Sequence, residues 1–384
     1  MTKGVGTRMR IAEVRVHVLE AALSEPFSWA IGEAHSRGAA LVEITTDTGL
    51  SGFGECFGPA RPCAAMVEAY TPILVGADPL ASEQIWETLY DRFRDQGQKG
   101  VAISALSGVD IALWDLNGKH FGVPVHRLMG GPLRTEVAAY ATGTYRKERG
   151  DPFEYIVEEV KGYAAEGFTG VKLKVGFEVA EDAALTAAVR AAIGPEVALM
   201  LDANHGYDAI EAIRLGRRVE GQDIAWFEEP VPPEDLDGYL AVKAAIAIPV
   251  AGGECEYTRF GFRNVLQRRA IDILQPDTCA AGGLSECKKI ADMANAFGVR
   301  VVPHVWGSAI GLAAALQLIA VLPRNPPGRR PLEPVLEFDR SEHPFRQAIV
   351  TTPIEHENGV VRIPEGPGLG IEIDRAALER FRVA

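Results

Sequence analysis

Long apolar runs are missing from this sequence, and cysteine is scarce. No run approaches the roughly 18 apolar residues that cross a bilayer, and the N-terminal residues lack the continuous apolar stretch of a secretion signal. The five cysteines are odd in number and form no Cys-x-x-Cys pair, so reduced thiols are expected rather than a disulfide scaffold. We therefore expect a soluble, cytoplasmic protein with no membrane partner.

Positive charge is also in short supply. The 39 Lys and Arg residues stand against 52 Asp and Glu, which leaves a net charge of −13 at pH 7. Because an acidic surface repels phosphate backbones and anionic lipid, a nucleic-acid partner is not expected. A small anionic substrate would have to be held by a local positive site.

The short motifs of several large enzyme classes are absent as well. The sequence contains no GxSxG, Walker A, HExxH or zinc-type Cys/His spacing, and its GFGEC string does not continue as a dinucleotide fingerprint. The chemistry must therefore be inferred from the positions of polar residues in the predicted fold.

What is present is a chain of 384 residues, 47% of them hydrophobic, which is long enough for two domains. Residues 11–19 alternate as in a β-strand, and Asp47-Thr48-Gly49 is typical of a hairpin turn between two further strands. Between 64 and 121 the apolar period becomes helical. Strands followed by helices predict an α+β capping domain over residues 1–132.

From residue 136 onward, short apolar strands alternate with amphipathic helices. Two helix starts are clear, at Asp151-Pro152 and at Pro232-Pro233-Glu234-Asp235. Repeated βα units require parallel strands, and eight of them close a TIM-type (modified β/α) barrel, predicted here over residues 133–340. Residues 341–384 are predicted to return to the cap. The expected strands lie near 136–141, 170–175, 197–202, 224–228, 248–252, 271–275, 299–303 and 334–337.

Three carboxylates end or follow consecutive predicted strands. Asp202, Glu228 and Glu254 are separated by 228 − 202 = 26 and 254 − 228 = 26 residues, one βα unit each. They would converge at the mouth of the barrel, where oxygen ligands with open positions suit Mg²⁺. The alternative is that each one caps the helix that follows. Glu229 points elsewhere by strand alternation and is expected only to support the site.

Two lysines precede this set by one unit. Lys172 and Lys174 are two residues apart, so both side chains face the same way, and 202 − 174 = 28 places them beside the carboxylates. Because neighbouring cations lower a lysine pKa, one of the two is expected to be a general base. The alternative is an ordinary exposed basic strand.

Across the predicted barrel, Asp277 and His304 end strands that are 304 − 277 = 27 residues apart. A carboxylate one strand before a histidine can fix its tautomer and raise its basicity. The alternative is a structural histidine, whereas His205, which follows Asn204 at the mouth, has no comparable partner in the sequence. Glu337 completes the ring, either as a hydrogen-bond partner of a substrate carboxylate or as a structural acid.

These residues, in this order, resemble the enolase superfamily and its mandelate racemase subgroup. The resemblance covers almost the whole chain and rests on GVKLKVG, LMLDANHGY, WFEEPV, AGGE, ILQPD, VVPH and VLEFD. It implies Mg²⁺ on Asp202, Glu228 and Glu254, with Lys174 and the His304–Asp277 dyad on opposite faces of the substrate. It also implies abstraction of the proton α to a carboxylate, with the metal and Lys172 stabilising the enediolate. Homo-oligomers are usual in this family.

A narrower similarity, to the D-galactarolactone cycloisomerases, rests on FGECFGPARPCAA, FRDQGQKG, PHVWG and EFDRSEHPFRQA. It implies that residues 27–33 and 56–63 close over the substrate. Arg61 would then bind a distal carboxylate bidentately or remain a solvated loop residue. Trp29 and Trp306 would shape the pocket or only pack, and Cys63 stands where the relatives carry Asn.

The function expected from these residues is Mg²⁺-dependent opening of an aldarolactone by β-elimination, which yields a keto-deoxy aldarate. Lys174 is favoured as the base, and His304 as the group that protonates the product or acts on the opposite face. The alternatives are an acid-sugar dehydratase, a racemase and a catalytically silent metal-binding barrel. The only expected partners are a small carboxylate substrate and further copies of the chain.

Overall fold

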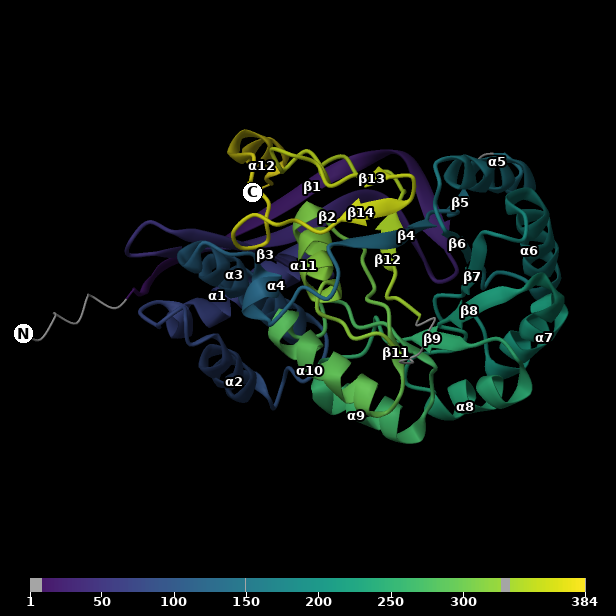
Figure 1. Ribbon diagram of the computed structural model, residues 1–384, viewed down its shortest axis with the longest axis horizontal. Helices are drawn as coiled ribbons and strands as arrows, with labels where there is room; N and C mark the ends of the chain where they lie inside the picture. Colours follow the sequence, from purple (N-terminus) through teal and green to yellow (C-terminus); the bar gives the residue numbers. More distant parts are fainter. Residues whose placement is uncertain (1–8, 149, 326–331, 384) are drawn as a thin grey trace, which may run out of the picture.

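The N-terminal part of the computed structural model, which describes residues 9–148, 150–325 and 332–383, is an antiparallel sheet beside a group of helices (Figure 1). The predicted turn at 47–49 is confirmed, because the Thr46 N–H donates to Leu50 O at 2.9 Å and Gly49 has a φ of 82°. The strands are β1 (Ile11–Trp29), β2 (Gly32–Thr46) and β3 (Ser51–Cys56). The helices are α1 (Ala60–Leu74), α2 (Ser82–Phe93), α3 (Val101–Phe121) and α4 (Val125–Leu128).

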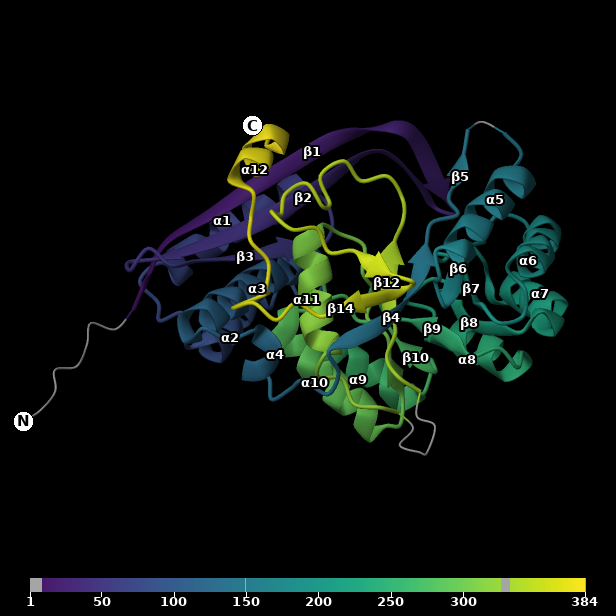
Figure 2. The ribbon, with the colours of Figure 1, turned by 45° about the horizontal axis from the view of Figure 1, so that its top comes forward.

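The hairpin formed by β1 and β2 is much longer than the alternation of residues 11–19 predicted. The register shifts between Ala22 and Phe27, which interrupts the regular alternation, but pairing continues to Trp29 opposite Gly32. At its tip β1 also pairs with β5 (Arg146–Lys147) in the second part of the chain. Figure 2 shows the hairpin spanning from the cap to β5, and this span brings Trp29 to the barrel mouth.

The second part is the predicted barrel of eight parallel strands with helices outside it (Figure 1). The observed ends differ from the prediction by no more than two residues. The strands are β4 (Glu136–Thr142), β6 (Gly170–Lys174), β7 (Ala198–Asp202), β8 (Ile224–Glu228), β9 (Val250–Gly252), β10 (Ile273–Leu274), β11 (Arg300–Val301) and β12 (Leu336–Asp339). The last strand, β12, returns to pair in parallel with β4.

The two barrel helices whose starts the sequence predicts begin at those positions. Asp151 caps α5 by accepting from the Phe153 N–H, with Pro152 at the first helical position, and Asp235 caps α8. The helices are α5 (Pro152–Ala165), α6 (Val179–Ile193), α7 (Ala209–Val219), α8 (Leu236–Ala245), α9 (Thr258–Arg268), α10 (Gly283–Ala296) and α11 (Ala309–Ile319), with a 3₁₀ turn, η1, at Glu220–Gln222.

Alternation along the strands separates the inside of the barrel from its outer layer. Leu173, Leu201 and Phe227 belong to the large core under the helices, whereas Met200 and Trp226 belong to a small cluster of inward-facing residues. Residues two positions further along the same faces therefore point inward at the carboxyl ends of the strands. This alternation of side chains along the strands positions the polar site, more than the conformational preference of any single residue does.

The C-terminal segment contacts both parts of the molecule. Its hairpin of β13 (His356–Glu357) and β14 (Val360–Arg362) adds to the barrel through antiparallel pairing of β14 with β4. The final helix, α12 (Arg375–Phe381), lies over β1 (Figure 1), where Arg375 forms two hydrogen bonds to Glu43, at 2.6 and 2.8 Å. The return to the cap that the sequence predicts is thus accompanied by contacts with the barrel.

The cap also contacts the barrel through the start of α10. Asp110 in α3 is buried and accepts hydrogen bonds from the Ser285 N–H at 2.9 Å and the Ser285 hydroxyl at 2.5 Å. A Cβ on Gly283 would lie 2.4 Å from the Asp110 carboxylate, and Gly283 has a φ of 82°. Glycine is therefore required there for close packing.

We expect the Asp110 contact to make stability depend on pH. Burial raises the pKa of Asp110 to about 7, although its hydrogen bonds to Ser285 oppose this rise. The folded chain thus keeps a proton that the unfolded chain loses near pH 4, so stability falls as pH rises between these values, by at most about 1.4 kcal/mol per pH unit. Asp110→Asn should flatten this slope in urea unfolding between pH 5 and 8. The exposed Asp292→Asn variant should keep it, and an unchanged slope in Asp110→Asn would contradict the prediction.

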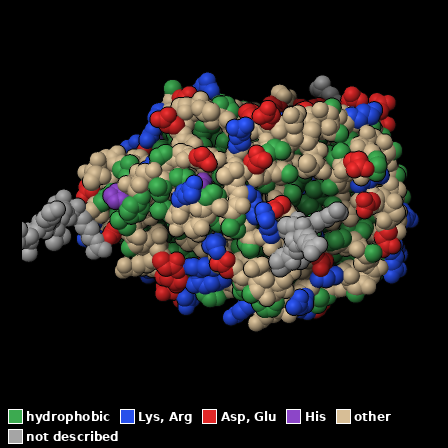
Figure 3. Space-filling model, viewed as in Figure 1, with side chains coloured by type: hydrophobic (Ala, Val, Ile, Leu, Met, Phe, Trp, Pro, Cys, Tyr) green, Lys and Arg blue, Asp and Glu red, His purple; other side chains and the backbone are tan. Residues whose placement is uncertain are grey.

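The surface shown in Figure 3 carries acidic and basic side chains interspersed, without a broad basic face on that side. Among the helices of the described residues, none has the length and apolar character needed to span a membrane.

Candidate active site

The polar residues predicted from the strand ends do come together at one end of the barrel. In the strand register Lys174 lies beside Asp202, and Asp202 lies beside Glu228. Glu254 follows β9 by two residues, and its side chain lies within 3.4 Å of His304 on the far side of the ring. One polar cluster therefore contains residues from strands on both sides of the barrel.

The two lysines are buried and paired with carboxylates. Lys172 Nζ lies 2.5 Å from Glu228 Oε1, 2.6 Å from Glu337 Oε1 and 3.4 Å from Asp202 Oδ2. Lys174 Nζ donates to Asp202 Oδ2 at 2.7 Å and to Asn204 Oδ1 at 2.9 Å. The exposed-strand alternative is thus wrong for both lysines.

The protonation of these lysines differs from the expectation raised by the sequence. Burial and the charge of Lys172 lower the pKa of Lys174, but Asp202 outweighs them and raises it. The pKa of Lys172 is also raised, because Glu228, Glu337 and Asp202 outweigh its burial. The expected lowering of a lysine pKa is therefore wrong for the chain without a cation, since adjacent carboxylates dominate the neighbouring ammonium group.

The carboxylates at the strand ends are held by further donors. Glu228 Oε2 accepts from Trp226 Nε1 at 2.9 Å and from Gln275 Nε2 at 2.7 Å, and Asp202 Oδ1 accepts from the Asn204 N–H at 2.9 Å. Sequence reasoning missed Gln275. The residue could have been predicted, because Gln275 precedes Asp277 by two residues and its side chain therefore lies on the same face of the strand.

The charge and chemistry of this set fit a divalent cation that prefers oxygen. Burial raises the pKa of Glu228 to about 7, with Lys172 opposing the rise and Asp202 adding to it. Two lysines and one histidine thus face five carboxylates, and the excess negative charge is costly in a buried site. The five are Asp202, Glu228, Glu254, Asp277 and Glu337. The carboxylate oxygens of Asp202, Glu228 and Glu254 match the ligand preference of Mg²⁺.

Asp277 and His304 form the predicted dyad. His304 Nδ1 lies 2.6 Å from Asp277 Oδ2, and Asp277 Oδ1 accepts from the Cys279 N–H at 2.6 Å, so the carboxylate is fixed from both sides. Burial opposes charge on His304, but Glu254 and the Asp277 hydrogen bond outweigh it and raise its pKa to about 10. Without a cation at Glu254, His304 is therefore a protonated acid at neutral pH.

Asp277→Asn should lower the pKa of His304, because the amide keeps the shape of the side chain but removes its charge. In metal-free protein the value should move from about 10 toward the ordinary range near 6.5. The shift can be measured by NMR titration of the imidazole C–H signals. Asp272→Asn, which removes a carboxylate paired with Lys243 instead, should leave the value in place. An unchanged pKa in Asp277→Asn would show that Asp277 does not support charge on His304.

Glu337 is already engaged by the protein. Besides contacting Lys172, it accepts from the Thr142 hydroxyl at 2.7 Å and from the Val305 N–H at 3.1 Å. These contacts fix it between β4, β6 and the segment after β11. It also lines the cavity described next.

A small cavity of about 110 Å³ opens onto the polar cluster. Trp29 and Phe57 from the cap approach His304 and Trp306 from the barrel, with ring centroids 6.3 Å apart for Trp29–Trp306 and 5.4 Å apart for Phe57–His304. The cavity thus joins the two parts of the chain. Its lining consists of Trp29, Phe57, Thr142, Tyr145, Lys174, Asn204, Glu254, His304, Trp306 and Glu337.

The residues that line this cavity differ in part from those predicted to bind the substrate. Arg61 is exposed in the first turn of α1 and is not part of the lining, and Cys63 is buried in the cap core. Phe57 and Tyr145 line the cavity but were missed. Phe57 lies in the 56–63 segment that the resemblance singled out, whereas Tyr145, in the segment after β4, has no recognisable signal.

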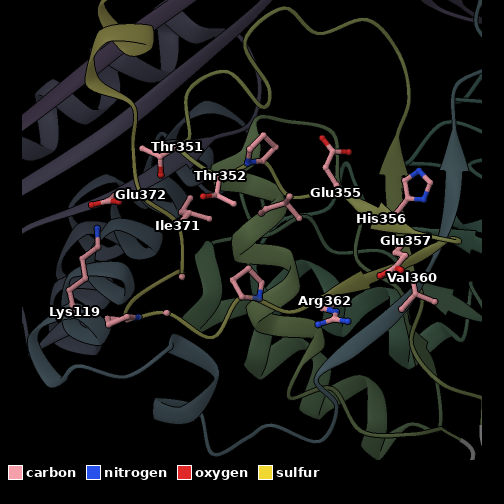
Figure 4. A pocket seen from close by; sticks show the side chains of 16 residues that line it. Lys119, Thr351, Thr352, Glu355, His356, Glu357, Val360, Arg362, Ile371 and Glu372 are labelled. Atoms are coloured by element: carbon pink, nitrogen blue, oxygen red, sulfur yellow. The ribbon is translucent and has the colours of Figure 1, made fainter.

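A larger hollow of about 800 Å³ lies elsewhere and carries none of the predicted site residues. Figure 4 shows Lys119 and Arg362 on opposite sides of it, with Thr351, Thr352 and Ile371 of the C-terminal segment between them. The smaller cavity, which is lined by Lys174 and by His304 of the dyad, is therefore the better candidate site.

Comparisons with known proteins agree with this geometry. Residues 11–130 match the family described as mandelate racemase / muconate lactonizing enzyme, N-terminal domain, and residues 155–377 match the enolase C-terminal domain-like family. The chain is 52% identical over 375 residues to the D-galactarolactone cycloisomerase of Agrobacterium fabrum, covering 98% of this chain and 99% of that protein. It is 34% identical to the arabinonate dehydratase of Saccharolobus solfataricus over 91% of each chain.

A solved structure is similar to the chain over nearly its whole length. The crystal structure of the 3,6-anhydro-D-galactonate cycloisomerase from Zobellia galactanivorans is similar with a TM-score of 0.89 and 39% identity, over 98% of this chain and 100% of that chain. The chain therefore belongs to the enolase superfamily, with the capping and barrel domains of the mandelate racemase / muconate lactonizing enzyme family.

Proposed function

We propose that this protein opens an aldarolactone by β-elimination and releases a keto-deoxy aldarate. The observation that carries the proposal is one cavity between cap and barrel that is lined by Lys174, the Asp277-supported His304 and the carboxylate Glu254. The 52% identity to a D-galactarolactone cycloisomerase supports the substrate class. A lactone with a free carboxylate is an anion, and Lys172 and Lys174 together with a divalent cation on the carboxylates would provide the local positive charge to hold it.

Mg²⁺ held by Asp202, Glu228 and Glu254 would supply positive charge that offsets these carboxylates and stabilises the enediolate oxygens. With the charge of Asp202 offset, burial and Lys172 would lower the pKa of Lys174 toward that of a usable base. Lys172 stays a cation because Glu337 still faces it.

The proposed reaction breaks the carbon–hydrogen bond α to the free carboxylate and the carbon–oxygen bond of the lactone at the β-carbon. Lys174 removes the proton α to the free carboxylate, and the lactone oxygen leaves the β-carbon as part of a carboxylate. As the resulting enol becomes the ketone, its β-carbon gains a proton, for which His304 is the donor that the cavity offers, and its hydroxyl loses one. Two protons leave and one is added, and the one released at neutral pH belongs to the new carboxylic acid. Counted as free acids, substrate and product are therefore isomers.

The roles of individual residues toward the substrate are part of this proposal. Trp29 and Trp306 enclose the ring and exclude water, and Asn204 orients Lys174 through their 2.9 Å hydrogen bond. Binding of a distal carboxylate by Arg61 stays a prediction. A cytoplasmic location and assembly into a homo-oligomer also stay predictions. The same holds for the division of the chain into residues 1–132, 133–340 and 341–384.

Incubation in D₂O with Mg²⁺ and a panel of aldarolactones and open acid sugars, followed by NMR, tests the proposal. Ring opening without loss of water is expected. Loss of a hydroxyl from an open acid would instead favour a dehydratase, which the 34% identity to arabinonate dehydratase makes the second candidate. Exchange of the α-proton without elimination would indicate a racemase. No exchange with any compound would favour a silent metal-binding barrel, a role that leaves Lys174, Asp277 and His304 without a purpose.

A further inference from the structure

A second cluster lies just beyond the proposed Mg²⁺ ligands and takes no part in the proposed reaction. His205, Glu229 and Cys255 follow β7, β8 and β9, and one possible ligand atom from each lies within 4.8 Å of the others. His205 Nε2 is 3.0 Å from Glu229 Oε2 and 3.5 Å from Cys255 Sγ. The expectation that His205 lacks a partner is therefore wrong.

The orientation of the His205 ring is that of a metal ligand. Its Nδ1 lies 3.4 Å from Val231 O, in position to donate its proton to that carbonyl. A histidine that donates through one nitrogen to a backbone carbonyl presents the lone pair of the other to a metal. Here that other nitrogen, Nε2, faces both the thiol of Cys255 and the carboxylate of Glu229.

This arrangement does not fit a nucleophilic triad. In a Cys-His-acid triad the thiol and the acid contact different ring nitrogens, so that the ring relays a proton between them. In this cluster both groups meet the same nitrogen, so three electron-rich atoms converge on one point. A proton donated by the Cys255 thiol to Nε2 accounts for one of these contacts but leaves the Glu229 carboxylate beside the same nitrogen without a donor, whereas a cation among the three atoms would satisfy all of them.

Glu229 gives the second, independent indication of a cation. It is 1% exposed, and neither of its oxygens accepts a hydrogen bond from a described residue. Its electrostatic surroundings include Asp202, Glu228 and Glu254, with Lys174 as an opposing cation. A buried carboxylate without donors is costly, and a proton shared between Glu229 Oε2 and His205 would still leave Glu229 Oε1 without a donor.

We propose that His205, Glu229 and Cys255 form a second metal site, distinct in chemistry from the oxygen-only site, for a borderline-soft divalent cation of the Zn²⁺ class. Nitrogen, oxygen and sulfur donors together select Zn²⁺ over Mg²⁺, which prefers oxygen alone. With Cys255 bound as a thiolate, the two anionic ligands balance the charge of the ion. The inference does not depend on the proposed reaction.

Cobalt substitution tests this site without any assay of turnover. Metal-free protein is given excess Mg²⁺ and then titrated with Co²⁺, and the near-ultraviolet thiolate-to-cobalt charge-transfer band is recorded. The band should rise with one Co²⁺ per chain and disappear when Zn²⁺ is added. Cys255→Ser should abolish it. Glu229→Gln should weaken Co²⁺ binding by at least about tenfold, since even the partners of metal ligands contribute that much.

Cys63→Ser, which removes a buried thiol from the cap, is the matched control and should keep the band. The proposal is overturned if the wild-type protein gives no thiolate band, if Mg²⁺ bleaches the band, or if Cys255→Ser retains it. Should Cys255→Ser fail to fold by circular dichroism, the presence or absence of the wild-type band and its displacement by Zn²⁺ still decide.

Discussion

Lys174→Ala is expected to reduce kcat for lactone opening by about 10²–10⁴-fold, and His304→Ala by a similar factor, because each positioned acid or base contributes on that order. Both side chains line the same cavity and are buried, so solvent cannot readily replace them. Steady-state rates with a lactone and Mg²⁺ provide the measurement. Lys161→Ala, on the exposed face of α5, should retain wild-type rates.

The two variants should differ in deuterium exchange. If Lys174 is the base, Lys174→Ala loses exchange of the α-proton in D₂O, whereas His304→Ala still exchanges it while product forms slowly. The opposite pattern would assign the base to His304. Near-wild-type turnover in both variants would contradict the proposed mechanism altogether.

Lys172→Met is expected to lower the free energy of unfolding by about 3–5 kcal/mol, since removing one partner of a buried ion pair leaves charge without compensation. Lys172 is 1% exposed, and its loss would leave Glu228 and Glu337 in the barrel interior without their nearest cation. Urea unfolding of metal-free protein measures the change. Activity should fall as well, because the enediolate loses a neighbouring positive charge.

The control for this prediction is the double variant Lys172→Met/Glu337→Gln. Removing one of the stranded carboxylates together with the lysine should recover part of the lost stability, a coupling that a simple packing defect would not show. A single variant as stable as the wild type, or a double variant no more stable than the single, would mean that the buried ion pairs do not determine stability here.

The arrangement of the active site was largely predictable, because it depends on two short-range regularities. Strand alternation places Lys172 beside Lys174, and the 26-residue interval places Asp202 and Glu228 at neighbouring strand ends. Both regularities are properties of the βα repeat, which the apolar pattern alone reveals. By the same parity, Gln275 could have been predicted from its position two residues before Asp277.

The long β1–β2 hairpin could not be predicted in the same way. Its pairing continues past the irregularity between Ala22 and Phe27, and its tip pairs with β5 of the barrel, a contact between segments far apart in the sequence. Trp29 and Phe57 consequently reach His304 and Trp306 across the boundary between cap and barrel. No local pattern in the sequence encodes that distance.

The sequence by itself therefore determined the barrel, the order of the polar strand ends and the dyad of Asp277 and His304, since these follow from periodicity and parallel connections. The tertiary structure alone decided the protonation of Lys174, because its pKa depends on the 2.7 Å contact with Asp202. It also decided the meeting of His205, Glu229 and Cys255. Two of these, His205 and Glu229, have left-handed backbone angles beyond the strand ends, and there alternation no longer dictates where a side chain points.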